Sequence, residues 1–551
     1  MRIKKRFAIP AVLLVVIAAL VAFLNPILEG SLKAYLSEKL VVHNQDARYA
    51  LEYETLDLNI FREQLRLGGL RIQPTGTGDS NGGQDGLKQL RIPEVTLRGI
   101  GITHFLWADE LELHSLTLDS LLIRLDKPAK TKEKEAGDGG GMHIDSLALP
   151  GFKTFKLNEF AIGHFQLQVR DSSGRDTLAR FHGNELSLKG VAFAEAAQGN
   201  RNVLIPGLEN LELELGPQQY RWGNGLYGLT FESFRFRFDG GRLRIESLSM
   251  TPEGGEELFA SRNSHSYEMY TAACSSLEID DMDMGGLLDQ GRLHMGSVRI
   301  DSLDARIFRD KTKPYDMERR VPMPPEALAG IHFEIRADSV VLDNAYLEYF
   351  ERLPNTDQHV EVSFQELNAV ISNIRTTAES LKGTDTLKVV LQSNLLEAVP
   401  VSLDLRMPFA SDRVLLTGRT SGSSRLHQLN PTIYPALNMR FTGGRLDGIY
   451  FTASGNSHRM RGELEMLYTD LEVELLNEDH ETKKTLSWLA NALVKNSNPD
   501  RRGKTIVGTI DFERNAHKGV WNYVWKSVQS GVVNTLNPIG DRQKEKPGRK
   551  N

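Results

Sequence analysis

Apolar and polar residues alternate along most of this chain, and that spacing constrains the fold more than any other feature. Apolar side chains take every second position in residues 56–60, 211–215 and 234–238. Because successive side chains of a strand point to opposite faces, this period predicts β-strands with one apolar and one polar face. In residues 111–125 the pattern is densest, and steps such as Asp119–Ser120 predict turns or bulges between short strands.

Strands of this kind must bury their apolar faces. A closed sandwich or barrel does so by packing sheet on sheet, whereas a long curled sheet leaves the apolar face lining a groove. The number of strands favours a sheet that splits or curls. We therefore predict a mainly β protein with an elongated, curled antiparallel sheet. The candidate groove residues are Leu56, Leu58, Ile60, Leu111, Leu113, Leu116, Leu118, Leu211, Leu213, Phe234 and Phe236.

The N-terminal region predicts a membrane anchor. Residues 1–6 are basic, and residues 7–24 form an uninterrupted apolar run that is long enough to cross a bilayer. The positive-inside rule keeps the basic segment in the cytoplasm and places the rest of the chain on the far side. A cleaved signal peptide is the alternative, but no clear small-residue cleavage site follows. Residues 25–48 are expected to form a juxtamembrane helix or linker.

Composition narrows the class of protein. Charged residues make up 25% of the chain and the net charge is −6, so no basic stripe for nucleic acid is expected. Cys274 is the single cysteine, which excludes an intramolecular disulfide framework. It follows Ala272 and Ala273, and we expect a buried, unreactive thiol.

Breaks in the strand pattern divide the chain. Stretches rich in Gly, Pro or charge at residues 75–86, 127–141 and 311–325 predict loops. The last is the candidate boundary between an N-terminal half at residues 49–310 and a C-terminal half at residues 326–475. A helical and β cap is expected at residues 476–538, and a basic, disordered tail at residues 539–551.

Two amphipathic helices are predicted in the cap, at residues 483–494 and 519–536. Trp521 and Trp525 lie at helical spacing in the second. Two tryptophans followed by a basic tail place this helix at a membrane interface, or else the helix caps the end of the sheet as an ordinary core element.

No catalytic constellation stands out. His265, His294 and His332 lack neighbours at zinc-site spacing, and the phosphate-binding, dinucleotide and nucleophile-elbow motifs are absent. Asp79 and Asp85 lie in a glycine-rich loop, but a calcium loop would need an acid where Leu90 stands. The sequence therefore predicts no enzyme, no metal site and no cofactor.

Both ends of the exported part resemble AsmA-like envelope proteins. The resemblance rests on residues 53–61 and 65–72 after the anchor, and on residues 429–431, 443–447, 455–456, 461–462 and 466–471 near the far end. Residues 324–328 and 331–340 are similar to Bacteroidota members of that family. The resemblance implies an elongated β-groove, related to bridge-like lipid-transfer proteins. It also implies an inner-membrane anchor with the bulk of the chain in the periplasm.

The implied activity is non-enzymatic movement of phospholipid or another acyl lipid, or a role in outer-membrane assembly. Membrane lipids are the expected partners, with envelope proteins as further candidates and no nucleic acid. An envelope scaffold that docks partners through its sheet, and an enzyme with a site that motifs do not show, are the alternatives. An unpaired sheet edge would favour the scaffold, and a continuous apolar trough would favour lipid.

Overall fold

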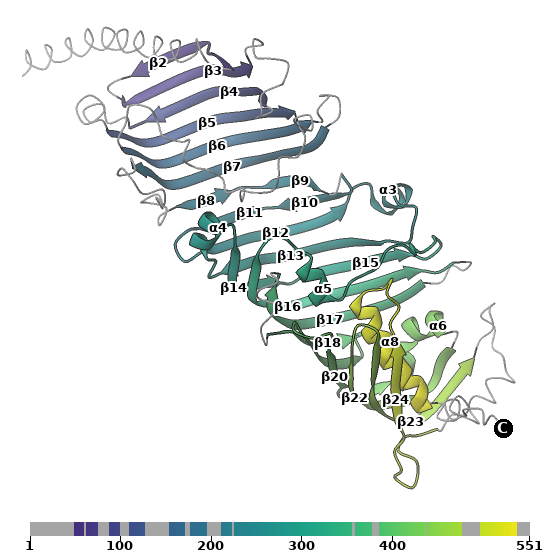
Figure 1. Ribbon diagram of the computed structural model, residues 1–551. Coiled ribbons are helices and arrows are strands. Elements are labelled where there is room, and N and C mark those ends of the chain that lie inside the picture. The colour runs from purple at the N-terminus through teal and green to yellow at the C-terminus, as the bar shows by residue number, and fades with distance from the viewer. Residues whose placement is uncertain are drawn as a thin grey trace, which may run out of the picture. The chain divides into compact units, whose positions relative to one another are not determined.

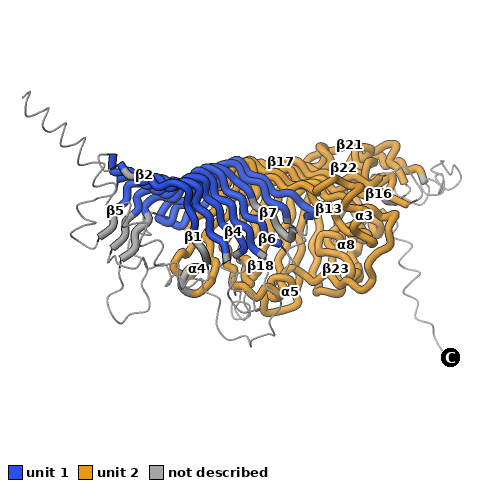
Figure 2. Tube along the Cα trace, turned by 90° about the horizontal axis from the view of Figure 1, so that it is seen from above, with its two compact units in different colours: residues 1–243 blue, residues 244–551 orange. Residues whose placement is uncertain are grey.

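The computed structural model describes residues 49–59, 62–74, 87–99, 110–126, 154–170, 177–194, 211–222, 225–354, 359–376, 385–437, 439–475 and 496–536. The protein is mainly β with few helices (Figure 1). It divides into two compact units, residues 1–243 and residues 244–551 (Figure 2). The predicted boundary at residues 311–325 lies inside unit 2, where it links two strands of one sheet.

Unit 1 is a sheet. Its described strands are β1 (Tyr49–Glu52), β2 (Thr55–Asn59), β3 (Gln64–Pro74), β4 (Leu87–Arg98), β5 (Glu110–Asp126), β6 (Thr154–Arg170), β7 (Thr177–Ala194), β8 (Glu212–Leu215), β9 (Gln218–Trp222), β10 (Tyr227–Phe231) and β11 (Ser233–Arg237). β1 and β2 share β3 as partner, and β3 to β7 pair in chain order. β7 then pairs with β8 and β9, which pair with β11 and β10 respectively.

Unit 2 is a sheet with helices. Its described strands are β12 (Arg242–Pro252, which starts at the end of unit 1), β13 (Glu268–Asp280), β14 (Leu293–Asp301), β15 (Asp304–Asp310), β16 (Ile335–Arg352), β17 (His359–Arg375), β18 (Thr386–Leu395), β19 (Val399–Pro408), β20 (Val414–Thr420), β21 (Ser424–Arg425), β22 (Met439–Gly455), β23 (Arg459–Leu475) and β24 (Val507–Glu513). Its described helices are α3 (Gly255–Arg262), α4 (Met284–Gln290), α5 (Pro324–Ala329), η5 (Leu426–Leu429), α6 (Asn430–Leu437) and α8 (Val520–Leu536).

Each sheet contains a parallel step, so the prediction of a purely antiparallel sheet is wrong. β5 runs parallel to β6, and β14 and β15 both run parallel to β16. Parallel neighbours need a crossover connection instead of a tight hairpin. Two of the predicted loops, at residues 127–141 and 311–325, fall in these two connections, which precede β6 and β16.

β5 is one continuous strand, although its apolar spacing changes phase at Asp119–Ser120. Leu118 and Leu121 pack into the same apolar cluster, which strict alternation would not allow for residues three apart. Ile162 and Phe165 show the same shift in β6 and join that cluster. Between them a Cβ on Gly163 would lie 2.7 Å from the carbonyl oxygen of Asp119, so the close backbone approach requires glycine.

The C-terminal end of unit 2 has a closed core. Its fully buried side chains include Leu405, Leu416, Met460, Leu464 and Ile510, each 0% exposed. The predicted helix at residues 519–536 is confirmed as α8, which packs on β23 and β24. A Cβ on Gly531 would lie 2.8 Å from side-chain atoms of Ile510 and Leu464, so the helix and the sheet are in close contact there. In this position α8 covers the apolar face of the sheet (Figure 1).

The predicted anchor at residues 7–24, the segments 1–6 and 25–48, the helix at residues 483–494 and the tail at residues 539–551 lie outside the described residues. Within the described part of the chain, no helix has both the length and the apolar character that a bilayer crossing requires.

Candidate functional site

Two rows of apolar residues cross unit 1 from strand to strand at matched positions of the register. In strand order, the first row is Leu56, Leu67, Val95, Leu118, Ile162, Leu186, Leu215 and Phe234. The second row is Leu58, Leu65, Leu97, Leu116, Phe160, Leu188, Leu213 and Phe236. Residues two apart in a strand share a face, so both rows lie on one face of the sheet. We call them the apolar rows.

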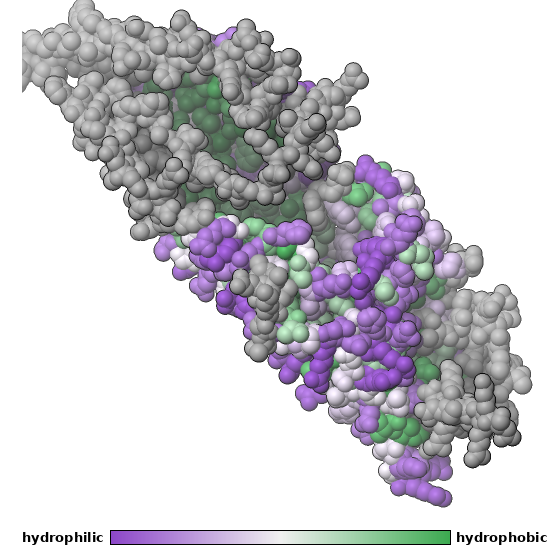
Figure 3. All heavy atoms as spheres, in the orientation of Figure 1, coloured by the Kyte–Doolittle hydropathy of each residue, from purple (hydrophilic) through white to green (hydrophobic). Residues whose placement is uncertain are grey.

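The apolar rows form an extended surface. Seven interstrand steps of about 4.8 Å give each row a length of about 34 Å. In Figure 3, hydrophobic atoms gather over β4 to β7 on the face of unit 1 that is turned toward the viewer. The surface is therefore long enough to contact a whole acyl chain.

Most side chains of the apolar rows are only partly buried. Leu56, Leu118 and Ile162 are buried, with 2%, 7% and 5% of their surface exposed, whereas every other row member whose side chain is described is half-buried. No helix covers this face among the described residues of unit 1, in contrast to α8 in unit 2. Within the described part of unit 1, most of the apolar surface of the rows is thus only partly buried.

The opposite face of the same strands is charged. Glu214 accepts hydrogen bonds from Arg235 at 2.9 Å and from Lys189 at 3.3 Å, and Arg237 lies 3.5 Å from Glu212. The hydrogen bond from Arg235 is the largest cause that lowers the pKa of Glu214 below its usual value. These exposed ion pairs contribute little stability, but they make this face the hydrated one.

The structure brings most of the predicted groove residues together. Leu56, Leu118, Leu116, Leu213, Phe234 and Phe236 belong to the apolar rows, and the backbone of Leu58 is in register with them. Leu113 is buried opposite Leu157, and Leu211 lies beside Phe238 just before β8. The side chains of Leu58 and Leu111, and all of Ile60, lie outside the described residues.

Other members of the apolar rows were missed as site residues. Val95 and Leu97 alternate with polar residues as clearly as the predicted ones do, whereas Ala161 separates Phe160 from Ile162. What sequence reasoning lacked was the register, which decides that these positions line up across neighbouring strands.

Helix α8 presents an apolar stripe away from the sheet. Trp521 is 53% exposed, Trp525 is 38% exposed and Val533 is 51% exposed. Trp521 and Trp525 occupy positions i and i+4 and are neighbours on one side of the helix, and Val533 lies about 80° further round. Tyr523 and Val524 are buried on the other side. The prediction of a core element is therefore confirmed for one side of the helix. The membrane interface stays a prediction, for which the two tryptophans are exposed.

Replacing Trp521 and Trp525 together with alanine tests the exposed stripe. In full-length chain reconstituted into one population of vesicles, we expect association with a second population to fall about tenfold, because two partly inserted aromatic side chains contribute at least about 1.5 kcal/mol. The free energy of unfolding should change by no more than about 0.5 kcal/mol. The matched control replaces Tyr450 and Val507, exposed elsewhere in unit 2, and equal losses in both variants would contradict a role for α8.

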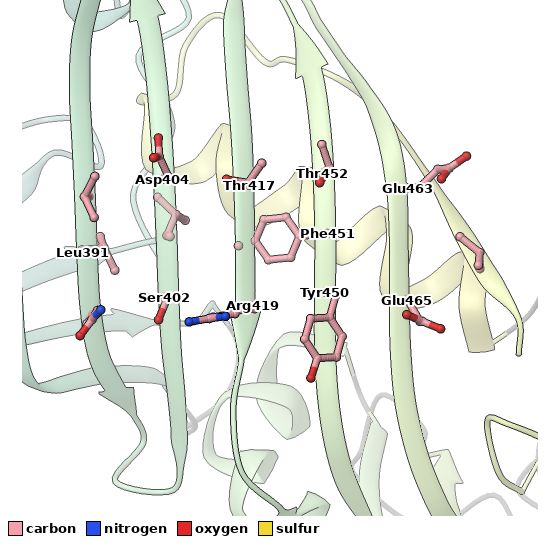
Figure 4. A pocket seen from close by; sticks show the side chains of 15 residues that line it. Leu391, Ser402, Asp404, Thr417, Arg419, Tyr450, Phe451, Thr452, Glu463 and Glu465 are labelled. Atoms are coloured by element: carbon pink, nitrogen blue, oxygen red, sulfur yellow. The ribbon is translucent and has the colours of Figure 1, made fainter.

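A shallow hollow of about 550 Å³ lies on the other face of the unit 2 sheet (Figure 4). Asp404, Arg419, Tyr450, Glu463 and Glu465 line it from neighbouring strands. Asp404 accepts two hydrogen bonds of 2.8 Å from Arg406, which lower the pKa of that carboxyl. The groups alternate across a flat sheet face instead of converging on one point, so the hollow has the character of a hydrated surface.

Other reactive groups are isolated. Nε2 of His294 lies 2.8 Å from Glu334, and no group of three or more metal-binding side chains converges within the described residues. Cys274 is buried, as predicted, and burial raises the pKa of its thiol.

No family model matches the sequence, and no curated protein matches it.

Proposed function

We propose that this protein binds acyl lipid on the apolar rows of unit 1 and carries it between membranes of the cell envelope. The observation that supports this most is the register itself, which aligns apolar residues across eight strands while charged residues occupy the opposite face. Most of the aligned side chains that the structure describes are half-buried. The resemblance to AsmA-like proteins agrees with the same activity. The predicted anchor would hold the chain at the inner membrane, with its bulk in the periplasm.

Energetics favour a surface of this kind. Moving a lipid out of a bilayer costs about 0.8 kcal/mol of free energy for every methylene that becomes exposed to water. Contact with the apolar rows recovers part of that cost, while the polar head stays hydrated. Movement along such a surface needs no covalent step, so the proposal requires no catalytic residue and no cofactor.

Docking of a partner strand is disfavoured at the C-terminal edge of the unit 2 sheet. The amide nitrogens of Thr509 and Asp511 in β24 donate to Asn534 Oδ1 at 2.8 Å and to Ser530 Oγ at 3.3 Å, both on α8. An edge strand whose backbone N–H groups already form hydrogen bonds has fewer of them available to pair with an added strand. We therefore rank the scaffold function below lipid binding.

The test is the lipid content of the purified full-length chain, measured by mass spectrometry. We expect the wild type to hold at least about one phospholipid per chain more than a variant in which a leucine of the apolar rows is replaced by glutamate. That variant controls for lipid held elsewhere on the chain. Equal lipid content in both proteins, with both folded, would overturn the proposal.

A further inference from the structure

Four cationic side chains gather beside the sheet of unit 2. Two of them share one aromatic ring, since Arg309 Cζ lies 4.6 Å and Lys518 Nζ lies 4.9 Å from the centroid of Tyr315. Lys526 on α8 carries a pKa lowered by burial first, and then by the positive charges of Lys518 and Lys311. We call Arg309, Lys311, Lys518 and Lys526 the basic cluster. Its members come from β15, from the connection after β15 and from the C-terminal segment that contains α8.

The basic cluster holds more positive charge than its neighbours neutralise. Arg309 pairs with Glu268 at 2.8 Å, and Lys311 pairs with the buried Glu351. Lys526 donates to the neutral Gln529 at 2.8 Å. Among the described residues neither Lys518 nor Lys526 forms an ion pair, so four cations face two carboxylates. Half-buried charge of one sign is costly unless an anion neutralises it.

A buried donor also lacks a partner in this cluster. The hydroxyl of Tyr315 is inaccessible to solvent and forms no hydrogen bond with any described residue. Buried hydroxyls in folded proteins nearly always form one, so an unpaired one requires an explanation. The hydroxyl belongs to the ring that Arg309 and Lys518 flank. An anion that several donors surround would satisfy it.

Apolar residues adjoin the basic cluster on the same face of the sheet. Three residues of neighbouring strands are in register beside the cluster: Glu268 in β13, Arg309 in β15 and Glu351 in β16. A second row lies two positions further along each of these strands and consists of Tyr270, Ile307 and Tyr349. The two rows are about 7 Å apart on one face. Tyr270 is 44% exposed, so the second row is open to solvent at β13. Charge and apolar surface are thus adjacent, as an amphiphile requires.

We propose that the basic cluster binds the phosphate of an anionic lipid whose acyl part lies on the row of Tyr270, Ile307 and Tyr349. The proposal rests on the lipid-binding function and adds a head-group preference to it. Phosphate suits the cluster because its several oxygens can accept from two ammonium groups and from the Tyr315 hydroxyl together. A phosphomonoester of charge close to −2 would also match the excess of two cations.

The test measures binding of two soluble short-chain lipids to the full-length chain by calorimetry. Dihexanoyl phosphatidic acid carries the phosphate, and dihexanoylglycerol carries the same acyl chains without it. In the variant K518Q/K526Q we expect affinity for the phosphatidic acid to fall at least tenfold, and affinity for dihexanoylglycerol to stay within twofold. The control K388Q/K504Q removes the same charge elsewhere in unit 2 and should change neither affinity.

A second variant guards against loss of folding. Y315F removes only a hydroxyl that has no partner among the described residues, so the ligand-free protein should be at least as stable as the wild type. Its affinity for phosphatidic acid should nevertheless fall severalfold.

Four outcomes would overturn the head-group site. One is unchanged binding of phosphatidic acid in K518Q/K526Q. Another is binding of inorganic phosphate as tightly as the lipid, because that result would indicate a site for free phosphate. Equal binding of both lipids by the wild type would remove this inference alone, whereas binding of neither would also count against the lipid-binding function.

Discussion

Replacing Leu116 with glutamate should abolish most lipid binding by the apolar rows of unit 1. Leu116 lies half-buried in the second apolar row, paired with Leu97 on one side and Phe160 on the other. A carboxylate there would displace acyl contacts and would itself resist transfer out of water. Loss of contact with only two methylenes costs about 1.6 kcal/mol, which lowers affinity more than tenfold. We therefore expect the co-purifying phospholipid that the apolar rows hold, counted by mass spectrometry, to fall at least tenfold.

Thr117 provides the matched control, because it is the next residue of β5 and lies exposed on the opposite face. Thr117→Glu introduces the same charge in the same strand and should leave lipid content unchanged. Circular dichroism of both variants separates loss of lipid from loss of structure, and Phe160→Glu repeats the test on the neighbouring strand. Lipid lost equally from L116E and T117E would show that the apolar rows are not the binding surface.

Replacing Leu464 with alanine should destabilise unit 2 by about 2–5 kcal/mol, the usual cost of truncating a fully buried leucine. Leu464 is 0% exposed and contacts α8 at Gly531, so its truncation leaves a cavity between helix and sheet. By hydrogen exchange, the protected amides of β23 and β24 should open about 30-fold to several thousandfold more often, because each 1.4 kcal/mol is a factor of ten.

Glu463→Ala controls for this substitution, since Glu463 is the preceding residue and is exposed on the other face. A change within about 0.5 kcal/mol is expected there. Faster exchange in L464A should appear in β23, β24 and α8 together. If exchange in α8 were unchanged while β23 became labile, the helix would not be part of this core.

The sequence predicts the secondary structure and the faces of most strands well. Leu56 and Asp57, or Phe234 and Arg235, alternate as a half-buried strand must, and the helix at residues 519–536 has a clear apolar side. These features are local, because each depends on side chains within one element. That is why the mainly β character and α8 were both predicted correctly.

Strand direction and register depend on contacts between elements, and there the sequence misleads. Leu118 and Leu121 suggested separate strands, but a phase shift at Gly163 and Asp119 keeps both on one face of continuous strands. The parallel pairing of β5 with β6 was missed because a proline- or glycine-rich stretch can close a hairpin or precede a crossover. The apolar rows become apparent only when the register is known.

The basic cluster was missed for a related reason. Arg309 and Lys311 precede Lys518 and Lys526 by about 200 residues in the sequence. Each alone is an ordinary charged residue in or beside a strand or helix. Only the packing of α8 and its preceding segment over the sheet brings Lys518 to the Tyr315 ring beside Arg309, and Lys526 near Lys311.

The most direct test of the account is photo-crosslinking in living cells from single positions on the two faces of one sheet. A photoreactive phenylalanine analogue is placed at Leu97, Leu116 or Phe160 in the second apolar row, and at Thr117 or Arg235 on the charged face. We expect crosslinks to lipid at the three positions of the second apolar row and none at the two positions on the charged face. Lipid crosslinks of equal yield on both faces, or on neither, would contradict the claim that the apolar rows bind lipid.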